Sequence, residues 1–279
     1  MMILSPAKTM DLSPYEGSLQ KQMTLPQCNL SKTLEIVDAM KSRNEKELTK
    51  LLSISSNLGK TANEYWETFE NDFANADAAA KPCIYAFTGV AYQGLQVQEC
   101  SDDAVLYLQN NIRIIDPLYG SLRPLDKIQA YRLEMSTRGV FKDKKIKLSD
   151  YWKDSVTESL ANDLKERKAK LVLNVASDEY SSAVDPSGLP SGTKFVKINF
   201  LDGGRVVTVH AKRARGLMAR FVGENNCQTL EDVKKFDYEG YKFSQSNSND
   251  ECLVFERTKE AAQKRKGSGS TGSTKKRKK

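Results

Sequence analysis

A run of positive side chains near the end of the chain is the strongest candidate for a chemical site. The segment 205–222 contains Lys212, Arg213, Arg215 and Arg220. A helix that begins near Arg213 already has a partial positive charge and free N–H groups at its first turn, so cations there oppose the helix dipole. No acidic residue lies between Gly203 and Gly223, so the charge is not balanced locally. Such a cluster could bind a phosphate.

Gly216 lies within this run and adds a second feature. At 100° per residue, it falls on the same side of the predicted helix as Arg213 and Arg220, opposite an apolar stripe that includes Leu217 and Phe221. That side would present bare backbone between two guanidinium groups. The sequence leaves an alternative equally open, in which the arginines pack their aliphatic stems along the core and keep their charges in water.

Polar residues also follow two predicted central strands, at the point where each strand ends. The first nine residues indicate a short buried strand that ends in Ser5, Lys8 and Thr9, and the strand 170–176 is followed by Ser177 and Glu179. Ligands of open α/β sheets bind outside the carboxyl ends of the strands, so we expect these residues near one site. The glycines of a P-loop are absent, and a lone lysine after a strand is more often an ordinary surface residue.

The segment 118–135 is the densest polar block in the first half of the chain. Pro117, Gly120 and Pro124 indicate a stiff, irregular segment. Its candidate site residues are Arg123, Tyr131 and Arg132. Loops of this kind often carry function. The alternative is a set of salt bridges, such as Arg123 with Asp126, that only pins the loop.

Several classes of chemistry are disfavoured by what the chain lacks. His210 is the only histidine, which excludes a multi-histidine metal site, and without a GxSxG motif a Ser-His-Asp triad is disfavoured. The five cysteines are scattered without CxxC spacing, so we expect reduced thiols rather than disulfides or zinc ligands. The carboxylates of Glu134, Asp178 and Glu179 leave a Mg²⁺ site or general acid–base catalysis open without indicating either. We predict no cofactor and no bound metal.

Apolar spacing predicts the regular elements that must position these residues. Helices are expected over 30–40, 45–58, 61–73, 149–168 and 230–236, with a further helix that Ser101 caps. Strands are expected over 83–87, 112–115, 170–176, 195–201, 205–211 and 253–256. Asp202, Gly203 and Gly204 predict a hairpin between two of these strands. The expected fold is a single mixed α/β domain, with a mixed central sheet flanked by helices and a positively charged cleft.

Composition places the chain among ordinary globular proteins, with 39% apolar and 28% charged residues in a length of 279. No apolar run reaches the roughly 18 residues of a membrane span, and the first apolar run is too short for a signal peptide, so we expect a cytoplasmic protein with no membrane partner. Of the net charge of +7, residues 261–279 supply eight cations and no acid, which leaves 35 basic against 36 acidic residues elsewhere. A nucleic-acid hypothesis for the body must therefore rest on local patches.

Five segments of the chain, taken in order, carry a family resemblance. They are SPAKT at 5–9, FTGxxYQGL at 87–95, LYGxLRPLDxxxxYRLEM at 118–135, LNxASDEY at 173–180 and AKRARGLMxRF at 211–221. Together they resemble the peroxide-stress resistance protein YaaA family. The resemblance covers one expected domain, 1–257, and leaves 258–279 as a disordered basic tail with a Gly/Ser linker. The tail departs from the family and favours nuclear localisation or tethering to DNA, against a merely solvated or added segment.

The resemblance implies a mixed α/β domain whose positive cleft binds double-stranded DNA through a helix-hairpin-helix-like element. It also implies protection against peroxide by limiting free iron and oxidative DNA damage. The phosphate contacts would come from Lys8, Arg123, Arg132, Lys212, Arg213, Arg215 and Arg220. The supporting residues would be Ser5, Thr9, Gly120, Tyr131, Ser177, Glu179, His210 and Gly216, with 118–125 as the hairpin. Such binding would tolerate any DNA sequence and weaken with salt.

Two other functions stay open. The first is an enzyme that acts on a nucleotide or nucleobase, with Lys8, Glu179 and Arg215 around a small pocket, because clustered polar strand ends also describe an active site. The second is direct iron binding, which is the least favoured because the chain lacks paired cysteines and a second histidine. The two leading functions differ in ligand, a duplex in one and a small molecule in the other.

Overall fold

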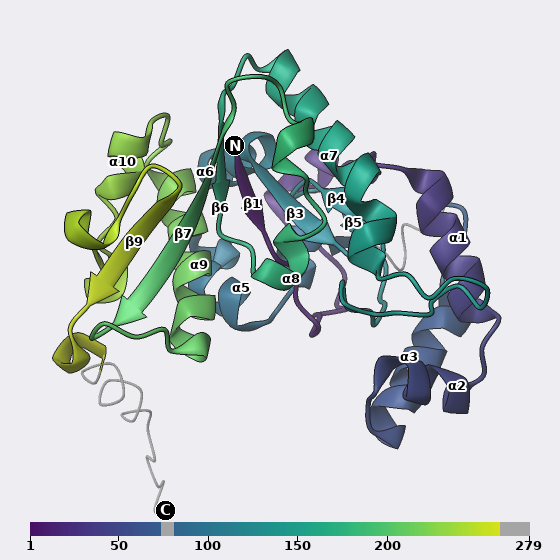
Figure 1. Ribbon diagram of the computed structural model, residues 1–279. Coiled ribbons are helices and arrows are strands. Elements are labelled where there is room, and N and C mark those ends of the chain that lie inside the picture. Colours follow the sequence, from purple (N-terminus) through teal and green to yellow (C-terminus); the bar gives the residue numbers. More distant parts are fainter. Residues whose placement is uncertain (74–80, 263–279) are drawn as a thin grey trace, which may run out of the picture.

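The body of the molecule is built on a seven-stranded mixed sheet, seen in a computed structural model that describes residues 1–73 and 81–262 (Figure 1). The strands lie in the order β4–β3–β1–β6–β7–β9–β8. Their bounds are β1 (Met2–Leu4), β3 (Ile112–Asp116), β4 (Gly120–Leu122), β6 (Leu171–Asn174), β7 (Lys194–Asp202), β8 (Lys242–Phe243) and β9 (Cys252–Arg257). The five inner strands are parallel, and β4 and β8 pair antiparallel at the two edges. The predicted mixed α/β fold is thus confirmed.

Burial along the strands explains how each is covered. All three residues of β1 are buried, as a parallel strand needs when both faces of its sheet are covered. In β7, by contrast, Val196, Ile198 and Phe200 are buried while the residues between them are only half-buried. The nine-residue β7 therefore has one face in the core and one nearer the solvent.

Helices surround the sheet and come largely from segments whose apolar spacing predicts them. Their bounds are α1 (Leu30–Lys41), α2 (Glu45–Leu52), α3 (Ser56–Thr68), α4 (Cys83–Ala86), α5 (Val90–Leu95), α6 (Asp102–Asn111), α7 (Leu148–Glu166), α8 (Asp178–Ser181), α9 (Thr208–Glu224) and α10 (Leu230–Lys234). Asn29 and Ser101 accept hydrogen bonds from amides in the first turns of α1 and α6. The predicted helix 45–58 ends early, because Ser53 adopts a left-handed conformation with φ 51°. Figure 1 shows α1, α2 and α3 grouped on the side away from β7 and β9.

The strand predicted over 83–87 is wrong, because these residues form the short helix α4. Only Lys81–Pro82 is extended, as β2, and it pairs with β5 (Lys127–Ile128) in a separate two-stranded sheet. The amides of Cys83 and Ile84 donate to carbonyl groups of Asp126 and Pro124, so the chain can turn into a helix without leaving buried donors unpaired. A short buried apolar run cannot by itself distinguish a helix from a strand.

The hairpin predicted after β7 is also wrong. Gly203 and Gly204 do turn the chain, with φ values of 55° and 79°, but the residues that follow enter α9 at Thr208 instead of a second strand. The reason is that β7 already pairs with β6 on one side and β9 on the other, so no free edge remains for a hairpin partner. The β-branched side chains of Val206 and Val209 stay exposed. Strand propensity is overridden here by the sheet order.

The structure bears on two further expectations, the absence of a membrane span and the disordered tail. Among those residues no helix is long and apolar enough to cross a membrane. Residues 259–262 at the start of the predicted tail are helical, and the Ala262 amide donates to the Thr258 carbonyl. The basic segment 263–279 lies outside the described residues.

Candidate functional site

A cavity of about 270 Å³ lies at the carboxyl ends of β1 and β6. We call it the strand-end cavity. Its wall includes Ser5, Lys8 and Thr9 after β1, Ser177, Glu179 and Tyr180 after β6, Gly89 and Tyr92 beside and within α5, and Lys212 and Arg215 from α9. Figure 1 shows α5 and α8 together at this end of the strands. The position is the one where open α/β sheets bind their ligands.

Hydrogen bonds between the strand ends hold the cavity wall in place. The Ser177 amide donates to Ser5 Oγ at 2.9 Å, which ties the end of β6 to the end of β1. The Tyr92 hydroxyl donates to the Ser5 carbonyl at 3.1 Å, which ties α5 to the same point. Because Tyr92 is buried, its pKa is raised and it stays a neutral donor. Ser5 therefore positions the other two elements and is not free for a ligand on those atoms.

The cations of the strand-end cavity differ in their neighbours. Lys8 Nζ lies 2.6 Å from Glu134 Oε1, so its charge is already paired. Lys212 is exposed, and neither it nor Arg215 forms a hydrogen bond or ion pair through its side chain with any described residue. Burial lowers the pKa of the Arg215 guanidinium, and Asp178 acts in the opposite direction. Arg215 is thus a partly buried, unpaired cation on the cavity wall, which an anion would stabilise.

Carboxylates also line or border the cavity. Glu179 Oε1 accepts the Ser136 amide at 3.1 Å, which fixes the carboxylate at the start of α8. Asp178 Oδ1 lies 2.6 Å from Lys197 Nζ. A site with an unpaired arginine and a fixed carboxylate can both hold an anion and move a proton. Within the described residues, no group of three or more His, Cys, Asp or Glu is arranged to hold a metal ion.

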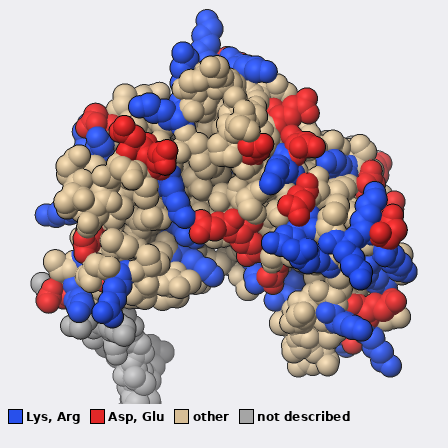
Figure 2. Space-filling model, in the orientation of Figure 1, with Lys and Arg blue, Asp and Glu red and all other residues tan. Residues whose placement is uncertain are grey.

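The structure brings together about half of the residues predicted from sequence. The strand-end cavity contains Ser5, Lys8, Thr9, Ser177, Glu179, Lys212 and Arg215. The others lie away from its wall: Gly120, Arg123, Tyr131, Arg132, His210, Arg213, Gly216 and Arg220. In Figure 2 the Lys and Arg side chains of the visible face lie intermingled with Asp and Glu. The single continuous positive groove that the sequence predicts is therefore not seen on this face.

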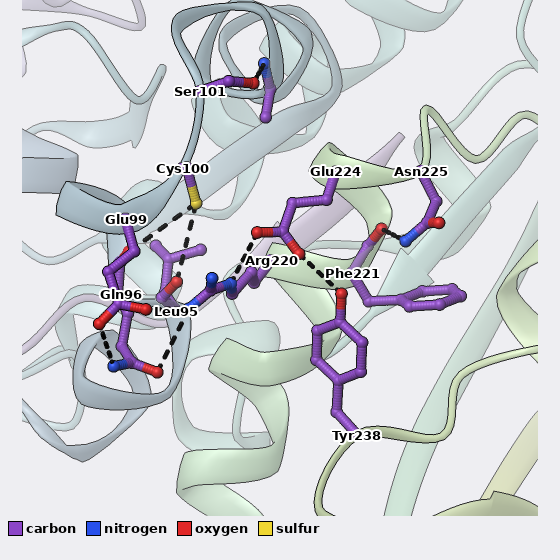
Figure 3. A network of polar contacts seen from close by, with 11 residues as sticks. Leu95, Gln96, Glu99, Cys100, Ser101, Arg220, Phe221, Glu224, Asn225 and Tyr238 are labelled. Carbon is purple, nitrogen blue, oxygen red and sulfur yellow. Dashed lines mark hydrogen bonds and ion pairs between the residues drawn. The ribbon is translucent and has the colours of Figure 1, made fainter.

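Arg213 and Arg220 are paired with acids, which come from other elements except for Glu224 at the end of α9 itself. Arg213 Nε lies 2.8 Å from Glu239 Oε1, and its Nη1 donates to the Gln93 carbonyl at 2.6 Å. Arg220 lies between two carboxylates, 2.8 Å from Glu224 and 2.9 Å from Glu99 (Figure 3). Both arginines are thus already engaged in ion pairs within the fold, and their role as phosphate ligands stays a prediction.

Gly216, predicted as a supporting residue of the cleft, has a packing role between two helices. It is buried where α9 crosses α5, and a Cβ atom at this position would lie 1.6 Å from the Ala91 carbonyl oxygen. A Cβ on Gly94 of α5 would lie 2.2 Å from the Arg213 carbonyl oxygen. The two glycines allow the backbones of α5 and α9 to touch. That contact places Arg215 on the cavity wall, which makes Gly216 important to the site indirectly.

The predicted hairpin 118–125 is part of the core. Leu118, Leu122 and Leu125 are fully buried, and Gly120 has φ 74° with a Cβ position 2.8 Å from the Trp152 ring. Its amides cannot reach a DNA backbone from there, so this placement of the hairpin is wrong. The side chain of Tyr131 is also buried, and its hydroxyl donates to Asp116.

The remaining predicted residues lie in three other places. Arg123 lines a separate polar cavity of about 340 Å³, where its Nη2 lies 3.7 Å from Asp163 Oδ1. Arg132 is half-buried, and its Nε has no hydrogen-bond partner within the described part of the chain. His210 Nδ1 contacts the Asp202 carboxylate, which also binds Arg257. None of the three faces the strand-end cavity.

Gly89, Tyr92 and Tyr180 are among the residues of the cavity wall that were not predicted as site residues. The signal for the first two was the pair of glycines that brackets Tyr92, at 89 and 94, which indicates a close backbone approach. Tyr180 was visible only as one of several polar residues after the strand 170–176. Burial raises its pKa, so it too is a neutral hydroxyl at the cavity.

Comparisons with a family model and with individual proteins indicate the same family. The family model for peroxide stress protein YaaA matches residues 1–247. A UPF0246 protein of Clostridium beijerinckii is 35% identical over 264 residues, covering 92% of this chain and 97% of the relative. A UPF0246 protein of Flavobacterium psychrophilum is 36% identical, covering 92% of this chain and 99% of the relative. The chain therefore belongs to the peroxide stress protein YaaA family, which supports a role in the response to oxidative stress.

Proposed function

We propose that the protein acts in the peroxide stress response by binding a phosphorylated ligand of nucleotide size in the strand-end cavity. The observation that carries this proposal is Arg215, a partly buried guanidinium on the cavity wall without a partner among the described residues. A phosphate there would accept hydrogen bonds from Arg215, with Lys212 nearby as a second cation.

The rest of the wall suits the other parts of such a ligand. Apolar surface from Pro6, Ala7 and Val90 lies beside the polar strand ends. The volume of about 270 Å³ is near the lower end of the range for small-molecule sites. This supports a compact ligand such as a nucleoside monophosphate and opposes a duplex inside the cavity.

A reaction at this site would have Glu179 as its general acid or base. The carboxylate is on the cavity wall and is held by the Ser136 amide, and Lys8 with Glu134 forms a second ionisable pair beside it. Proton transfer needs such a group within hydrogen-bond reach of the substrate. If the site is also catalytic, the protein is an enzyme that acts on a nucleotide or nucleobase.

The test is a calorimetric titration with adenosine monophosphate and with inorganic phosphate. Arg215→Gln should weaken binding of both by about tenfold or more, because a charge-assisted hydrogen bond is lost. Arg205→Gln is the matched control, since it removes the same charge from an exposed position outside the cavity. Equal binding by the wild type and Arg215→Gln would exclude Arg215 from the site and reject the proposal.

A second function, binding of double-stranded DNA, is favoured by a separate observation. Residues 261–279 contain eight cations and no acid, which is the composition of an electrostatic arm. If the protein binds DNA, the basic segment 261–279 supplies most of the contacts to DNA phosphates. The protein then limits iron-dependent damage to the DNA that it covers. The body contributes little, because Arg213 and Arg220 are paired with acids.

Fluorescence anisotropy with a short labelled duplex over a salt series tests this second function. The full chain should bind with an affinity that falls steeply as salt rises, and a chain truncated after residue 260 should lose most of it. If the truncated chain binds as tightly, the duplex site lies in the body. A loss on Arg215→Gln would then assign DNA, rather than a small molecule, to the region of the strand-end cavity.

A further inference from the structure

A third cavity, also of about 340 Å³ but distinct from the one that Arg123 lines, lies at the opposite ends of the same central strands. We call it the amino-end cavity. Its wall includes Met1 before β1, Asn111 of α6, Arg167 and Lys170 between α7 and β6, Val222 of α9 and Val233 of α10. Figure 1 shows the N-terminus at the end of β1 opposite α5 and α8. The amino-end and strand-end cavities are therefore separated by the length of the sheet.

The charged side chains on the wall of the amino-end cavity are all positive, although Asp163 and Glu166 behind the wall partly offset the charge of Arg167. The wall contains Arg167 and Lys170 and no acidic side chain. Arg167 Nε is buried and has no hydrogen-bond partner, and neither cation forms an ion pair within residues 1–73 and 81–262. The end of α7 favours a cation through the helix dipole, which explains a positive charge at this position. It does not explain a buried guanidinium nitrogen that lacks an acceptor.

The nearest carboxylates are already engaged. Asp163 binds Arg113 through two contacts of 2.6 and 2.8 Å, so it is not available to Arg167. Asp232, near the other side of the cavity, lies 2.9 Å from Lys235 and also accepts amides at the start of α10. Glu166 lines a different cavity. An anion entering from solvent would thus meet cations without having to displace an acid.

The electrostatics of the amino group of Met1 agree with this description. The group donates to the Leu171 carbonyl at 3.0 Å. Burial lowers its pKa to about 6, and Arg167 and Arg113 add to the effect. Burial likewise lowers the pKa of Arg167, with Arg113 as the next cause. The Arg167 and Arg113 guanidinium groups thus disfavour further positive charge at this end of the sheet, and a bound anion would interact favourably with Arg167.

The rest of the wall combines apolar residues with polar ones, of which Gln228 is exposed and Tyr107 is already bonded. Val222, Val233 and Leu173 provide apolar surface. The Tyr107 hydroxyl is occupied, because it donates to the Cys227 carbonyl. A ligand that fits would therefore have a charged group at one end and a short apolar body at the other.

We propose that the amino-end cavity binds a small organic anion, a phosphate or carboxylate with a short apolar body, at a site independent of the strand-end cavity. Arg167 and Lys170 hold the charged group, and Val222 and Val233 contact the body. The proposal does not rest on the function of the strand-end cavity. The amino-end cavity lies at the far end of β1 and β6 from the strand-end cavity. This position fits a separate effector site better than a second site for the same ligand.

The test is calorimetric titration of the full chain with hexyl phosphate, hexanoate and inorganic phosphate. Hexyl phosphate or hexanoate should bind more tightly than inorganic phosphate, because the hexyl chain adds apolar contact. Whichever of hexyl phosphate and hexanoate binds more tightly shows whether the site prefers a phosphate or a carboxylate. Arg167→Gln should weaken that binding by about tenfold. Failure of both hexyl compounds to bind, or binding unchanged by Arg167→Gln, overturns the proposal.

Two controls separate this site from other causes. Lys165→Gln removes one charge from an exposed position on α7 outside the cavity and should change the affinity less than twofold. The titrations are repeated in the Arg215→Gln background, which removes phosphate binding in the strand-end cavity. Hexyl phosphate binding that persists in Arg215→Gln and is weakened by adding Arg167→Gln supports the amino-end cavity, whereas its loss in Arg215→Gln alone would mean that the ligand binds in the strand-end cavity instead. If Arg167→Gln does not fold, judged by circular dichroism, Lys170→Gln and Arg167→Lys decide, with each expected to weaken binding severalfold.

Discussion

At the carboxyl ends of β1 and β6 the cations of the strand-end cavity lie among carboxylates, whereas the cations at the amino ends of the same strands do not. Lys8 is 2.6 Å from Glu134, and Glu179 stands on the same wall as Arg215. The wall around Arg167 and Lys170 contains no acid. Mixed charge supports selective binding and proton transfer, while a wall whose charges are all positive supports binding alone. The two ends of one sheet are thus suited to different tasks.

The largest expected effect concerns how α9 brings Arg215 to the carboxyl end. Gly216→Ala should destabilise the fold by about 5 kcal/mol, because its Cβ would lie 1.6 Å from the Ala91 carbonyl oxygen and the backbones cannot separate without losing the α5–α9 contact. Urea unfolding measures the change. In the control Gly192→Ala, the new Cβ meets nothing within 4 Å, so only the positive φ of 78° should cost about 1 kcal/mol. Similar values for both would show that α5 and α9 can move apart freely.

Gly216 also shows where the sequence stops being informative. Its place beside Arg213 and Arg220 on one side of α9 follows correctly from helical periodicity. Glu224, four residues after Arg220, could be foreseen as a partner, but the other acceptors come from distant segments: Glu239 lies 26 residues after Arg213, and Glu99 lies 121 residues before Arg220. Charge clusters in a sequence therefore cannot show which charges are free.

The strand ends could be predicted for a simple physical reason. Ile3 and Val172 belong to short buried apolar runs, and the polar residues that follow them, Ser5 and Ser177, meet because the two strands are adjacent and parallel. The prediction of a second hairpin strand was wrong because β7 pairs instead with β9, whose residues lie 55 positions later in the chain. Arg167 gave no signal at all, since a cation at the end of a helix obeys the dipole rule.

Substitutions of two arginines at the amino end of the sheet should change the free energy of unfolding by very different amounts. Arg113→Met should destabilise by about 3–5 kcal/mol, because it leaves the buried Asp163 carboxylate without its partner. Arg167→Met should change stability by less than about 0.5 kcal/mol or stabilise, because Arg167 has no partner to lose within the described chain. Thermal and urea unfolding of both variants measure the contrast. A large loss on Arg167→Met would mean that this arginine holds the fold together and is not free for a ligand.

A pH-dependent contribution is expected from Asp116, at the carboxyl end of β3. Burial raises its pKa from 3.8 to about 6, while Tyr131 and two amides partly oppose the shift. The folded state therefore holds the proton more tightly than the unfolded state, and stability falls as pH rises from about 4 to 6. The change from this group is about 3 kcal/mol, since each pKa unit corresponds to about 1.4 kcal/mol.

Asp116→Asn isolates this group from other titrating carboxyls. Between pH 4 and pH 7, the unfolding free energy of the wild type should fall by about 3 kcal/mol more than that of Asp116→Asn. Measuring both proteins by urea unfolding at several pH values gives the difference directly. Parallel pH profiles would show that Asp116 is charged at low pH in the folded protein, and hence that water reaches this end of the sheet.

The smallest expected effect on stability bears most directly on the contrast between the two ends. Glu134→Gln removes the partner of the half-exposed Lys8 and should cost less than about 1 kcal/mol, as surface ion pairs do. It also frees Lys8 beside Arg215, so adenosine monophosphate should bind about threefold more tightly. Glu99→Gln removes one of the two carboxylates that pair with Arg220, away from the cavity, and should leave the affinity unchanged. Tighter binding in Glu134→Gln alone would show that removing an acid from the carboxyl end makes its anion binding more like that expected at the amino end. Weaker binding would mean that Glu134 holds Lys8 in place for the ligand, so that the acids at this end assist anion binding instead of competing with it.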